Sequence, residues 1–452
     1  MAKEESAISP RFQSDCEDDD KKTKDFVRDE LKNVEKWDAS GVDFDKRTLE
    51  GRKANRGFTI SIGKTSNATA AELEPLRKEK RAQTLPASNM RRGDHILSPE
   101  AQENLFKMNE TLKARYRRGS VTVATTILSD EQLIATWQEK CTHHTHGMMT
   151  EGQQHGDERE RTTIGEPLKD APIVSCHKGS KGFRDTTPNQ DNFSITVYKN
   201  GWTLACAFDG HGPFGHIVST RTVQTIPYFV AHSPSFPDDM PTALIEGFER
   251  GQKELVAHSL ENGWDVQASG STAVACCWKD DVIYTANAGD SRCVIGTETT
   301  RKVLFETEDH KPNTPSEKDR IEASGGEVRT QTYPDGWVNH RIFVKGEDFP
   351  GLCMARTLGD ESVKQHGVIA TPEVKMTKVN LSEAPFILLA SDGVWEFLDS
   401  EFVIKAVAKK IKSDGPERTV QKLQREAKKR WKQEEGEYCD DITSVLIQLG
   451  PR

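Results

Sequence analysis

The middle of the sequence contains Ala207-Phe208-Asp209-Gly210-His211-Gly212, where an apolar run that begins at Trp202 ends in a carboxylate, two glycines and an imidazole. The run is short, almost wholly apolar and followed at once by turn residues, which is typical of a buried strand. Asp209 would project from the strand end, the glycines would let the backbone approach an ion, and His211 can exchange a proton near neutral pH. Because Asp-Gly is also an ordinary turn signal, this segment alone leaves a plain turn open.

Four other apolar segments are bordered by an aspartate: Asp191, Asp290, Asp392 and Asp440. Buried carboxylates repel one another and are costly to desolvate, so several at strand ends need a compensating cation. Oxygen ligands select a hard ion such as Mg²⁺ or Mn²⁺ over zinc. Each aspartate alone could cap a turn, but five in this placement predict a metal site. Two such ions can hold a bridging water in line for attack on phosphorus, which needs no covalent nucleophile.

The composition limits the classes of protein to which the chain can belong. Its 452 residues have a formal net charge of -9, which argues against a dedicated nucleic-acid surface. The nine cysteines include no CxxC pair, so we expect reduced thiols. No apolar run approaches the roughly 18 residues needed to span a bilayer, and the first residues resemble no secretory or myristoylation signal. We therefore expect a soluble cytoplasmic protein, with the nucleus also open.

The first third of the chain predicts little packed structure. Residues 1–95 are polar, with an acidic cluster followed by a lysine-rich stretch, which favours disorder. A helix is predicted from Ser98 to Tyr116 by an N-cap serine, a proline in the first turn and apolar residues at helical spacing. A second short helix is expected from Ser129 to Cys141. We therefore expect residues 1–165 to be a mostly disordered extension with short helices, which could regulate the rest.

Two polar motifs in this extension have more than one interpretation. Arg117-Arg118-Gly119-Ser120 resembles a site for basophilic kinases, although a plain basic patch at a helix end is favoured. His143, His144 and His146 lie close together, as metal ligands would. Because their surroundings are rich in Thr, Gly and Met, we expect an exposed polar turn there instead.

From about Ile173 the sequence changes to short apolar runs separated by Gly and Asp. Strands are expected at 193–198, 203–208, 272–278, 282–288, 386–390 and 443–449. Helices are expected at 216–232, 242–259, 400–412 and 416–435. Hairpin-linked strands interrupted by helix pairs predict an α+β layered sandwich rather than a wound parallel sheet.

Ten motifs follow one another in a recognisable order. They are Asn189-Gln190-Asp191, Asp209-Gly210-His211-Gly212, Ser269–Ala273, Asn287–Arg292, Asp309–Pro312, Gly325–Val328, Ala355–Asp360, Gly367–Ile369 with Pro372-Glu373, Ala390–Trp395 and Asp440–Thr443. In this order they resemble the metal-dependent protein serine/threonine phosphatase family, type 2C. The resemblance covers roughly residues 170–450, and we place the catalytic domain at 166–452.

The resemblance implies both a fold and a metal centre. The fold would be a four-layer α-β-β-α sandwich, in which two antiparallel sheets are flanked by helix pairs and a dimetal cleft lies at one end. Two Mg²⁺ or Mn²⁺ ions would be held by the side chains of Asp191, Asp209, Asp392 and Asp440 and by the carbonyl of Gly210. Asp290 would serve a third, weaker ion.

The resemblance also implies two roles in catalysis. His211 matches the general acid that protonates the departing serine or threonine oxygen. Arg184 most nearly matches the phosphate-binding arginine, but it lies seven residues before Asp191, so Lys181 competes for the role.

Three positions bear on how far the resemblance extends. Gln190 stands where many members have Glu, which removes one negative charge beside the metals. Glu396 replaces the usual Asp after the tryptophan, which bears on the third ion. Asp360 belongs to a motif that we expect to support the fold rather than to bind metal.

These features predict a phosphatase that hydrolyses phosphoserine and phosphothreonine in proteins by direct attack of a water held between two metal ions. The alternative is a pseudo-phosphatase or scaffold that binds phosphoproteins without turnover, but all the core aspartates are present. We expect a monomer whose partners are phosphoprotein substrates, with no nucleic-acid partner and no transmembrane segment.

Residues 1–95 should be dispensable for folding, because their composition cannot bury enough apolar surface to offset the entropy of ordering the chain. Limited proteolysis of the full chain, followed by mass spectrometry, should therefore remove them first. A protease-resistant fragment that starts at Met1 would contradict this expectation.

Overall fold

The computed structural model describes residues 103, 104, 107, 108, 110, 127–149, 153–182, 185–332 and 338–450. The expectations for residues 1–95, for the motif Arg117-Arg118-Gly119-Ser120 and for Arg184 lie outside these residues, as does most of the helix expected from Ser98 to Tyr116. No described helix is both long and apolar enough to cross a bilayer.

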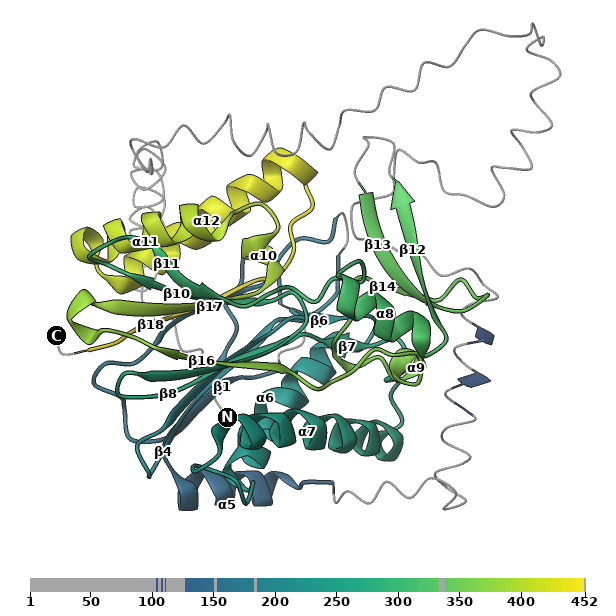
Figure 1. Cartoon of the computed structure of the whole chain (residues 1–452), viewed down its shortest axis with the longest axis horizontal. Helices are drawn as coiled ribbons and strands as arrows, with labels where there is room; N and C mark the ends of the chain where they lie inside the picture. Colours follow the sequence, from purple (N-terminus) through teal and green to yellow (C-terminus); the bar gives the residue numbers. More distant parts are fainter. Residues whose placement is uncertain are drawn as a thin grey trace, which may run out of the picture. The chain divides into compact units, whose positions relative to one another are not determined.

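Two antiparallel sheets form the centre of the protein (Figure 1). The seven-stranded sheet has the order β16-β9-β8-β5-β4-β1-β2, with β1 Cys141–Gly147, β2 Arg161–Gly165, β4 Asn192–Tyr198, β5 Thr203–Phe208, β8 Ala273–Lys279, β9 Val282–Ala288 and β16 Glu373–Lys378. The five-stranded sheet has the order β11-β10-β17-β18-β3, with β3 Ile173–His177, β10 Arg292–Thr297, β11 Val303–Glu306, β17 Pro385–Ala390 and β18 Ile442–Gln448.

Helices cover the outer face of each sheet (Figure 1). The seven-stranded sheet is covered by α5 Asp130–Lys140, α6 Gly215–Ala231 and α7 Met240–Asn262. The five-stranded sheet is covered by α11 Ser400–Asp414 and α12 Pro416–Glu435. The predicted α+β, four-layer α-β-β-α sandwich is confirmed.

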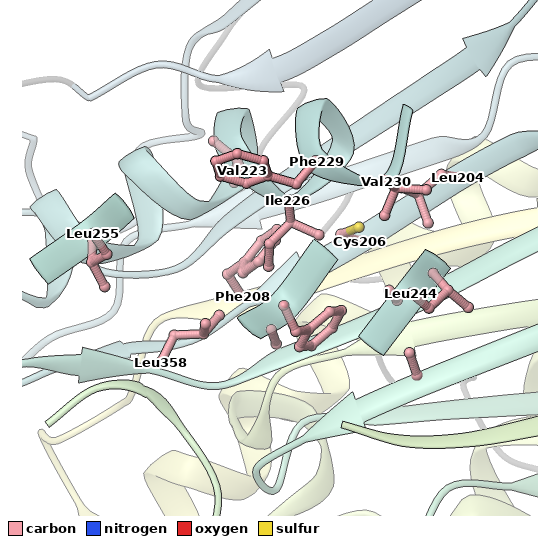
Figure 2. Close-up of a cluster of buried hydrophobic side chains, with 14 of the residues drawn as sticks. Leu204, Cys206, Phe208, Val223, Ile226, Phe229, Val230, Leu244, Leu255 and Leu358 are labelled. Carbon is pink, nitrogen blue, oxygen red and sulfur yellow. The ribbon is translucent and has the colours of Figure 1, made fainter. Parts of the chain in front are cut away.

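Strand β5 shows how the layers are held together, because its side chains alternate between two cores. Leu204, Cys206 and Phe208 face α6 and α7, where they pack with Ile226 and Leu244 (Figure 2). The intervening Ala205 and Ala207 face the second sheet and pack in the core between the sheets. The alternation is the two-residue period of a strand buried on both faces. The run that reads as continuously apolar in sequence is therefore divided between two separate apolar layers.

Smaller elements cluster at one end of the sandwich. A three-stranded sheet has the order β15-β7-β6, with β6 Gly210–His211, β7 Gly270–Ser271 and β15 Leu358–Gly359. A second three-stranded sheet consists of β12 Gly326–Thr332, β13 Val338–Val344 and β14 Pro350–Leu352. The short helices at this end are α8 Pro315–Ala323, α9 Glu361–Lys364 and α10 Asp392–Trp395. The 3₁₀ helix η3 Leu381–Glu383 lies at the other end, where the Thr299 N–H donates to the Glu383 carbonyl.

The folded part of the chain begins earlier than expected. We expected the catalytic domain to start at residue 166, but β1 pairs with β4, and β2 pairs with β1, so both strands belong to the seven-stranded sheet. A buried ion pair fixes the segment before them: Arg221 Nη2 donates to the Leu128 carbonyl at 2.6 Å, and the Leu128 N–H donates to Glu254 Oε1 at 3.2 Å. Arg221 and Glu254 bind each other between α6 and α7. The stretch from residue 128 is thus tied to both helices.

The expectation of an exposed turn at the three histidines is wrong. His144 lies in β1, is fully buried and stacks on Trp137 with ring centroids 3.9 Å apart. Its Nδ1 lies 2.8 Å from Thr196 Oγ1, and its Nε2 lies 3.0 Å from His146 Nδ1. The sequence shows no apolar alternation here, since polar side chains paired with one another replace apolar ones. Tertiary burial, not a hydrophobic pattern, makes this segment a strand.

The buried histidines should make the fold sensitive to acid. Burial lowers the pKa of His146 to about 4, so the folded state excludes a proton that the unfolded chain takes up as pH falls below its usual value of 6.5. Stability is therefore lost from pH 6.5 toward pH 4, and His146 alone accounts for about 2 kcal/mol of that loss at pH 5. Urea denaturation measures the free energy of unfolding. Between pH 7 and pH 5, this free energy should fall by about 2 kcal/mol less in His146→Gln than in the unmodified protein.

The control is His155→Gln, because His155 is exposed. This variant should show the same loss between pH 7 and pH 5 as the unmodified protein. If His146→Gln also shows the full loss, the unfolded and folded states do not differ in proton uptake at His146.

Candidate active site

Four aspartates border strands that are neighbours in antiparallel sheets. Asp191 precedes β4 and Asp209 follows β5, and the register places Asn192 opposite Phe208. Asp392 follows β17, and Asp440 precedes β18, the strand that pairs with β17. In an antiparallel pair the start of one strand lies beside the end of the next, so both sheets direct their aspartates to one end of the sandwich. The fold therefore brings together carboxylates that lie up to 249 positions apart (440 − 191).

The electrostatics of the aspartates show that they lie close together. Burial, and then the charges of Asp392 and Asp191, raise the pKa of Asp209 well above its usual range. Burial, followed by the charges of Asp440 and Asp290, also raises the pKa of Asp392. Burial together with the charge of Asp441 raises the pKa of Asp191 to about 7. Each of these three carboxylates therefore needs a cation nearby to remain ionised at low cost.

Lysines neutralise the two outer members of the group. Lys181 Nζ contacts Asp440, and although burial opposes ionisation, this lysine holds the pKa of Asp440 below its usual value. Lys311 Nζ lies 2.5 Å from Asp290 Oδ2. Within the described residues no lysine or arginine forms such a pair with the three inner carboxylates, Asp191, Asp209 and Asp392. The uncompensated negative charge therefore lies on Asp191, Asp209 and Asp392.

The donor set suits a hard divalent cation, because its members are buried or half-buried, oxygen-bearing and negatively charged. The side chains do not by themselves form a cage: among the described residues, no three or more His, Cys, Asp or Glu side chains are arranged to hold one ion. Asp191 instead accepts a hydrogen bond from Ser391 Oγ at 2.7 Å, and lysines contact the outer carboxylates. The chemistry of the set therefore fits the predicted metal ions, while the assignment of individual ligands remains a prediction.

His211 is held beside the carboxylates by Asp360. The His211 Nε2 atom lies 2.8 Å from Asp360 Oδ2, while His211 Nδ1 is buried without a hydrogen-bond partner among the described residues. The strands β6, β7 and β15 bring the two residues together, with Gly270 between them. A Cβ atom on Gly270 would lie 2.1 Å from Asp360 Oδ2 and 2.6 Å from His211 Nε2, so only glycine leaves room for this contact.

Asp360, which we expected to support the fold rather than to bind metal, also contacts His211. It is almost fully buried, and it adopts φ +46°, ψ +48°, a left-handed conformation that is uncommon outside glycine. Burial opposes its ionisation, but His211, Lys364 and Thr357 together outweigh burial and keep the pKa of Asp360 below its usual value. The signal in the sequence was the aspartate that ends the motif Ala355–Asp360.

Gln190 and Asp441 join the segments that carry the aspartates. The Gln190 side chain donates to the Gly212 carbonyl at 2.7 Å, and its backbone N–H donates to Asp441 Oδ2 at 2.8 Å. The other oxygen of Asp441 accepts from the Gly179 N–H at 2.7 Å. Gln190, where the resemblance implied a Glu in many members, is therefore a hydrogen-bonding link here. Asp441 was missed because its neighbour Asp440 satisfied the same motif.

The remaining predicted residues have different outcomes. Gly210 lies in β6, where a Cβ atom would approach the Gly215 carbonyl to 2.4 Å, so glycine is required for packing at this position. Arg184 falls outside the described residues, and its role in phosphate binding stays a prediction. Lys181, its competitor, contacts Asp440. The charge of Glu396 contributes to raising the pKa of Asp392, which places Glu396 near the group.

The fold resembles solved structures whose sequences have diverged. A serine-threonine phosphatase 2C from Toxoplasma gondii matches with a TM-score of 0.53 at 19% identity, over 67% of this chain and 98% of that one. A sex determining protein of C. elegans matches with a TM-score of 0.51 at 20% identity, over 64% of this chain and 67% of that one. At these identities the likeness concerns the fold alone.

Sequence relatives are more similar. A probable protein phosphatase 2C 65 of Arabidopsis thaliana is 31% identical over 308 residues, which are 62% of this chain and 76% of that protein. A probable protein phosphatase 2C 61 of the same plant is 35% identical over 292 residues, covering 62% and 84%. The family model of protein phosphatase 2C matches residues 170–436. The chain therefore belongs to the protein phosphatase 2C family.

Proposed function

We propose that this protein is a metal-dependent protein serine/threonine phosphatase that hydrolyses phosphoserine and phosphothreonine in protein substrates. The observation that carries the proposal is the group of buried and half-buried carboxylates, three of them without a lysine or arginine partner in the described chain, beside the His211–Asp360 pair. The first supplies a site for hard cations and the second a positioned proton donor, which are the two parts that phosphate ester hydrolysis requires.

The inner carboxylates would hold Mg²⁺ or Mn²⁺, together with Asp440 and the carbonyl of Gly210, and Asp290 would hold a weaker third ion. When bound, such ions neutralise phosphate oxygens and lower the pKa of a water molecule for direct attack on phosphorus. For metal ions to bind at Asp440 and Asp290, Lys181 and Lys311 must move away from these two carboxylates. Otherwise these two positions are the last to bind an ion. Lys181, once released, is a candidate with Arg184 for contacting the phosphate of the substrate.

His211 would donate a proton to the departing serine or threonine oxygen. The Asp360 carboxylate holds Nε2, which fixes the ring orientation and leaves Nδ1 as the nitrogen that can serve the leaving group. A serine alkoxide is a poor leaving group, so protonation in the transition state accelerates its departure. Asp360 is thus a positioning residue: it touches His211 and not the substrate.

The catalytic domain would extend over the described chain from about residue 127 to residue 450, because β1 and β2 are integral to its larger sheet. The preceding residues would form the extension that could regulate it. We expect the protein to act as a monomer on phosphoproteins in the cytoplasm.

Hydrolysis of a phosphothreonine peptide should stop in excess EDTA and return with Mg²⁺ or Mn²⁺. Asp209→Asn should cost several orders of magnitude in kcat with saturating metal, because it removes a central charge from the ion site. The same variant should melt a few degrees higher than the unmodified protein in EDTA, because it relieves repulsion among buried carboxylates. Differential scanning fluorimetry with and without Mn²⁺ measures this second effect.

The matched control is Asp238→Asn, since Asp238 is exposed on a loop away from the carboxylate group. It should match the unmodified protein in kcat and in both melting temperatures. Full activity in EDTA would refute the metal-dependent function, and an Asp209→Asn variant with normal turnover would refute the placement of Asp209.

His211→Gln should slow hydrolysis of a phosphoserine peptide by roughly 10²-fold or more, the usual contribution of a general acid. An aryl phosphate should be affected much less, because a phenolate leaves without protonation. Asp360→Asn should show the same selective loss to a smaller degree. The double variant should be no slower than His211→Gln alone, since Asp360 acts through His211.

Mn²⁺ affinity measured by calorimetry should stay unchanged in both single variants. Equal losses on the peptide and the aryl phosphate would show that His211 is a ligand or a structural residue. Additive losses in the double variant would show that Asp360 acts independently of the histidine.

A further inference from the structure

The helical layer on the five-stranded sheet carries a charge opposite to that of the whole chain. Residues 400–435, which include α11 and α12, contain eleven Lys and Arg against six Asp and Glu, a net charge of +5 (11 − 6). The complete chain has a net charge of -9. The two helices lie side by side on the outer face of the five-stranded sheet (Figure 1), so this excess of positive charge lies on that side of the sandwich.

Five of these cations form a single line along α12, which we name the α12 basic stripe: Arg418, Lys422, Arg425, Lys429 and Lys432. Their spacings of 4, 3, 4 and 3 residues (422 − 418, 425 − 422, 429 − 425, 432 − 429) keep them within a narrow sector of the helix. The buried residues of α12, among them Val420, Leu423 and Trp431, lie on the opposite side. The stripe is thus the solvent face of a helix whose apolar face is already packed.

Carboxylates flank the stripe but do not interrupt it. Lys422 lies 2.5 Å from Asp414, and Lys429 lies 3.9 Å from Glu426. Lys429 keeps 54% of its side chain exposed, and Arg418 and Lys432 are exposed as well. With a rise of 1.5 Å per residue, the stripe is about 21 Å long. An extended peptide of about six residues spans that length.

The end of α12 is connected to the active site. Trp431 Nε1 donates to the carbonyl of Gly393, the residue after Asp392, at 2.8 Å. The Trp431 ring also packs against Tyr438, whose hydroxyl donates to Asp440 Oδ2 at 3.4 Å. The stripe therefore runs along a helix whose C-terminal turns contact the segments that carry two of the site carboxylates.

The surface chemistry favours a peptide over a membrane. A helix that lies on a bilayer presents apolar residues beside its basic ones. The large hydrophobic side chains exposed in the described part of the chain are Ile134, Met148, Met149, Leu304, Val338 and Met376, and none belongs to α12. The stripe also lacks aromatic residues, which single-stranded nucleic acids use for stacking.

We propose that the α12 basic stripe is a docking surface for an acidic segment of the phosphoprotein substrate. In the sequence of the substrate, this acidic segment is separated from the phosphorylated residue. The proposal rests on the phosphatase function proposed above. Docking through exposed charges lowers the KM of substrates that carry such a segment and leaves kcat unchanged, because the contacts lie outside the reacting groups.

The test uses the full chain and three substrates. Two of the substrates are peptides in which phosphothreonine is followed by a flexible tether of about ten Gly and Ser residues. One peptide ends in six glutamates and the other in six glutamines. The third substrate is p-nitrophenyl phosphate. The unmodified protein should have a KM about tenfold lower for the glutamate peptide than for the glutamine peptide, since several weak exposed ion pairs add. The difference should shrink in 0.5 M NaCl, because salt screens exposed charges.

The variant is Arg418→Glu/Lys429→Glu/Lys432→Glu, which should abolish the KM difference while retaining kcat on p-nitrophenyl phosphate and the melting temperature. The charge-matched control is Lys169→Glu/Lys253→Glu/Lys302→Glu, three exposed lysines outside α11 and α12. It should keep the difference between the peptides.

Three results would overturn the proposal. The first is an equal KM for both peptides in the unmodified protein, the second is a loss of the difference in the control variant, and the third is stripe-dependent binding to phosphatidylserine vesicles without any effect on the peptides. Failure of the phosphatase function itself is distinguishable, because p-nitrophenyl phosphate and both peptides would then remain unhydrolysed with saturating Mn²⁺.

Discussion

Repulsion among buried carboxylates is the constraint on which the rest of this structure depends. Asp191, Asp209 and Asp392 come from both sheets to one end of the sandwich, where burial and mutual charge oppose their ionisation. Flexible loops would relieve such repulsion by moving apart. Strand ends cannot, because each is tied into a ladder of hydrogen bonds and to an apolar core on both faces. The stability of the sandwich is thus what keeps an unfavourable charge distribution in place, and that distribution is what gives a cation site its affinity.

The same rigidity positions the groups around the carboxylates. The short strands β6, β7 and β15 hold His211 against Asp360, and the absence of a side chain on Gly270 allows the two to meet. Gln190 joins two of the segments that carry the aspartates: its side-chain N–H donates to the Gly212 carbonyl, and its backbone N–H donates to Asp441. The residues around the site are therefore fixed by backbone pairing and close packing rather than by long flexible side chains.

Polar side chains also extend the fold away from the site. The Arg221–Glu254 pair secures the segment before α5, and the buried histidines of β1 take positions that apolar residues would usually fill. On the opposite outer layer, charge is gathered on the solvent face of α12 while Trp431 joins the same helix to the site. Each outer layer thus does more than cover a sheet. On one side, polar contacts attach β1 and the segment before α5 to the domain. On the other side, α12 presents a surface on which a substrate can dock.

The sequence by itself determined six strands and four helices after Ile173, because their apolar periodicity matches the cores they face, and each of their observed boundaries lies within three residues of the expected one. It did not predict β3, β10, β11 or β16, which complete the two main sheets. It also identified the aspartates and His211 as candidates for the site, since ordered motifs specify them. Only the tertiary structure decided that β1 and β2 belong to the domain, because their burial depends on neighbours far along the chain. The same holds for Asp360: its contact with His211 spans 149 positions and depends on the missing side chain of Gly270, a spatial relation that no local pattern encodes.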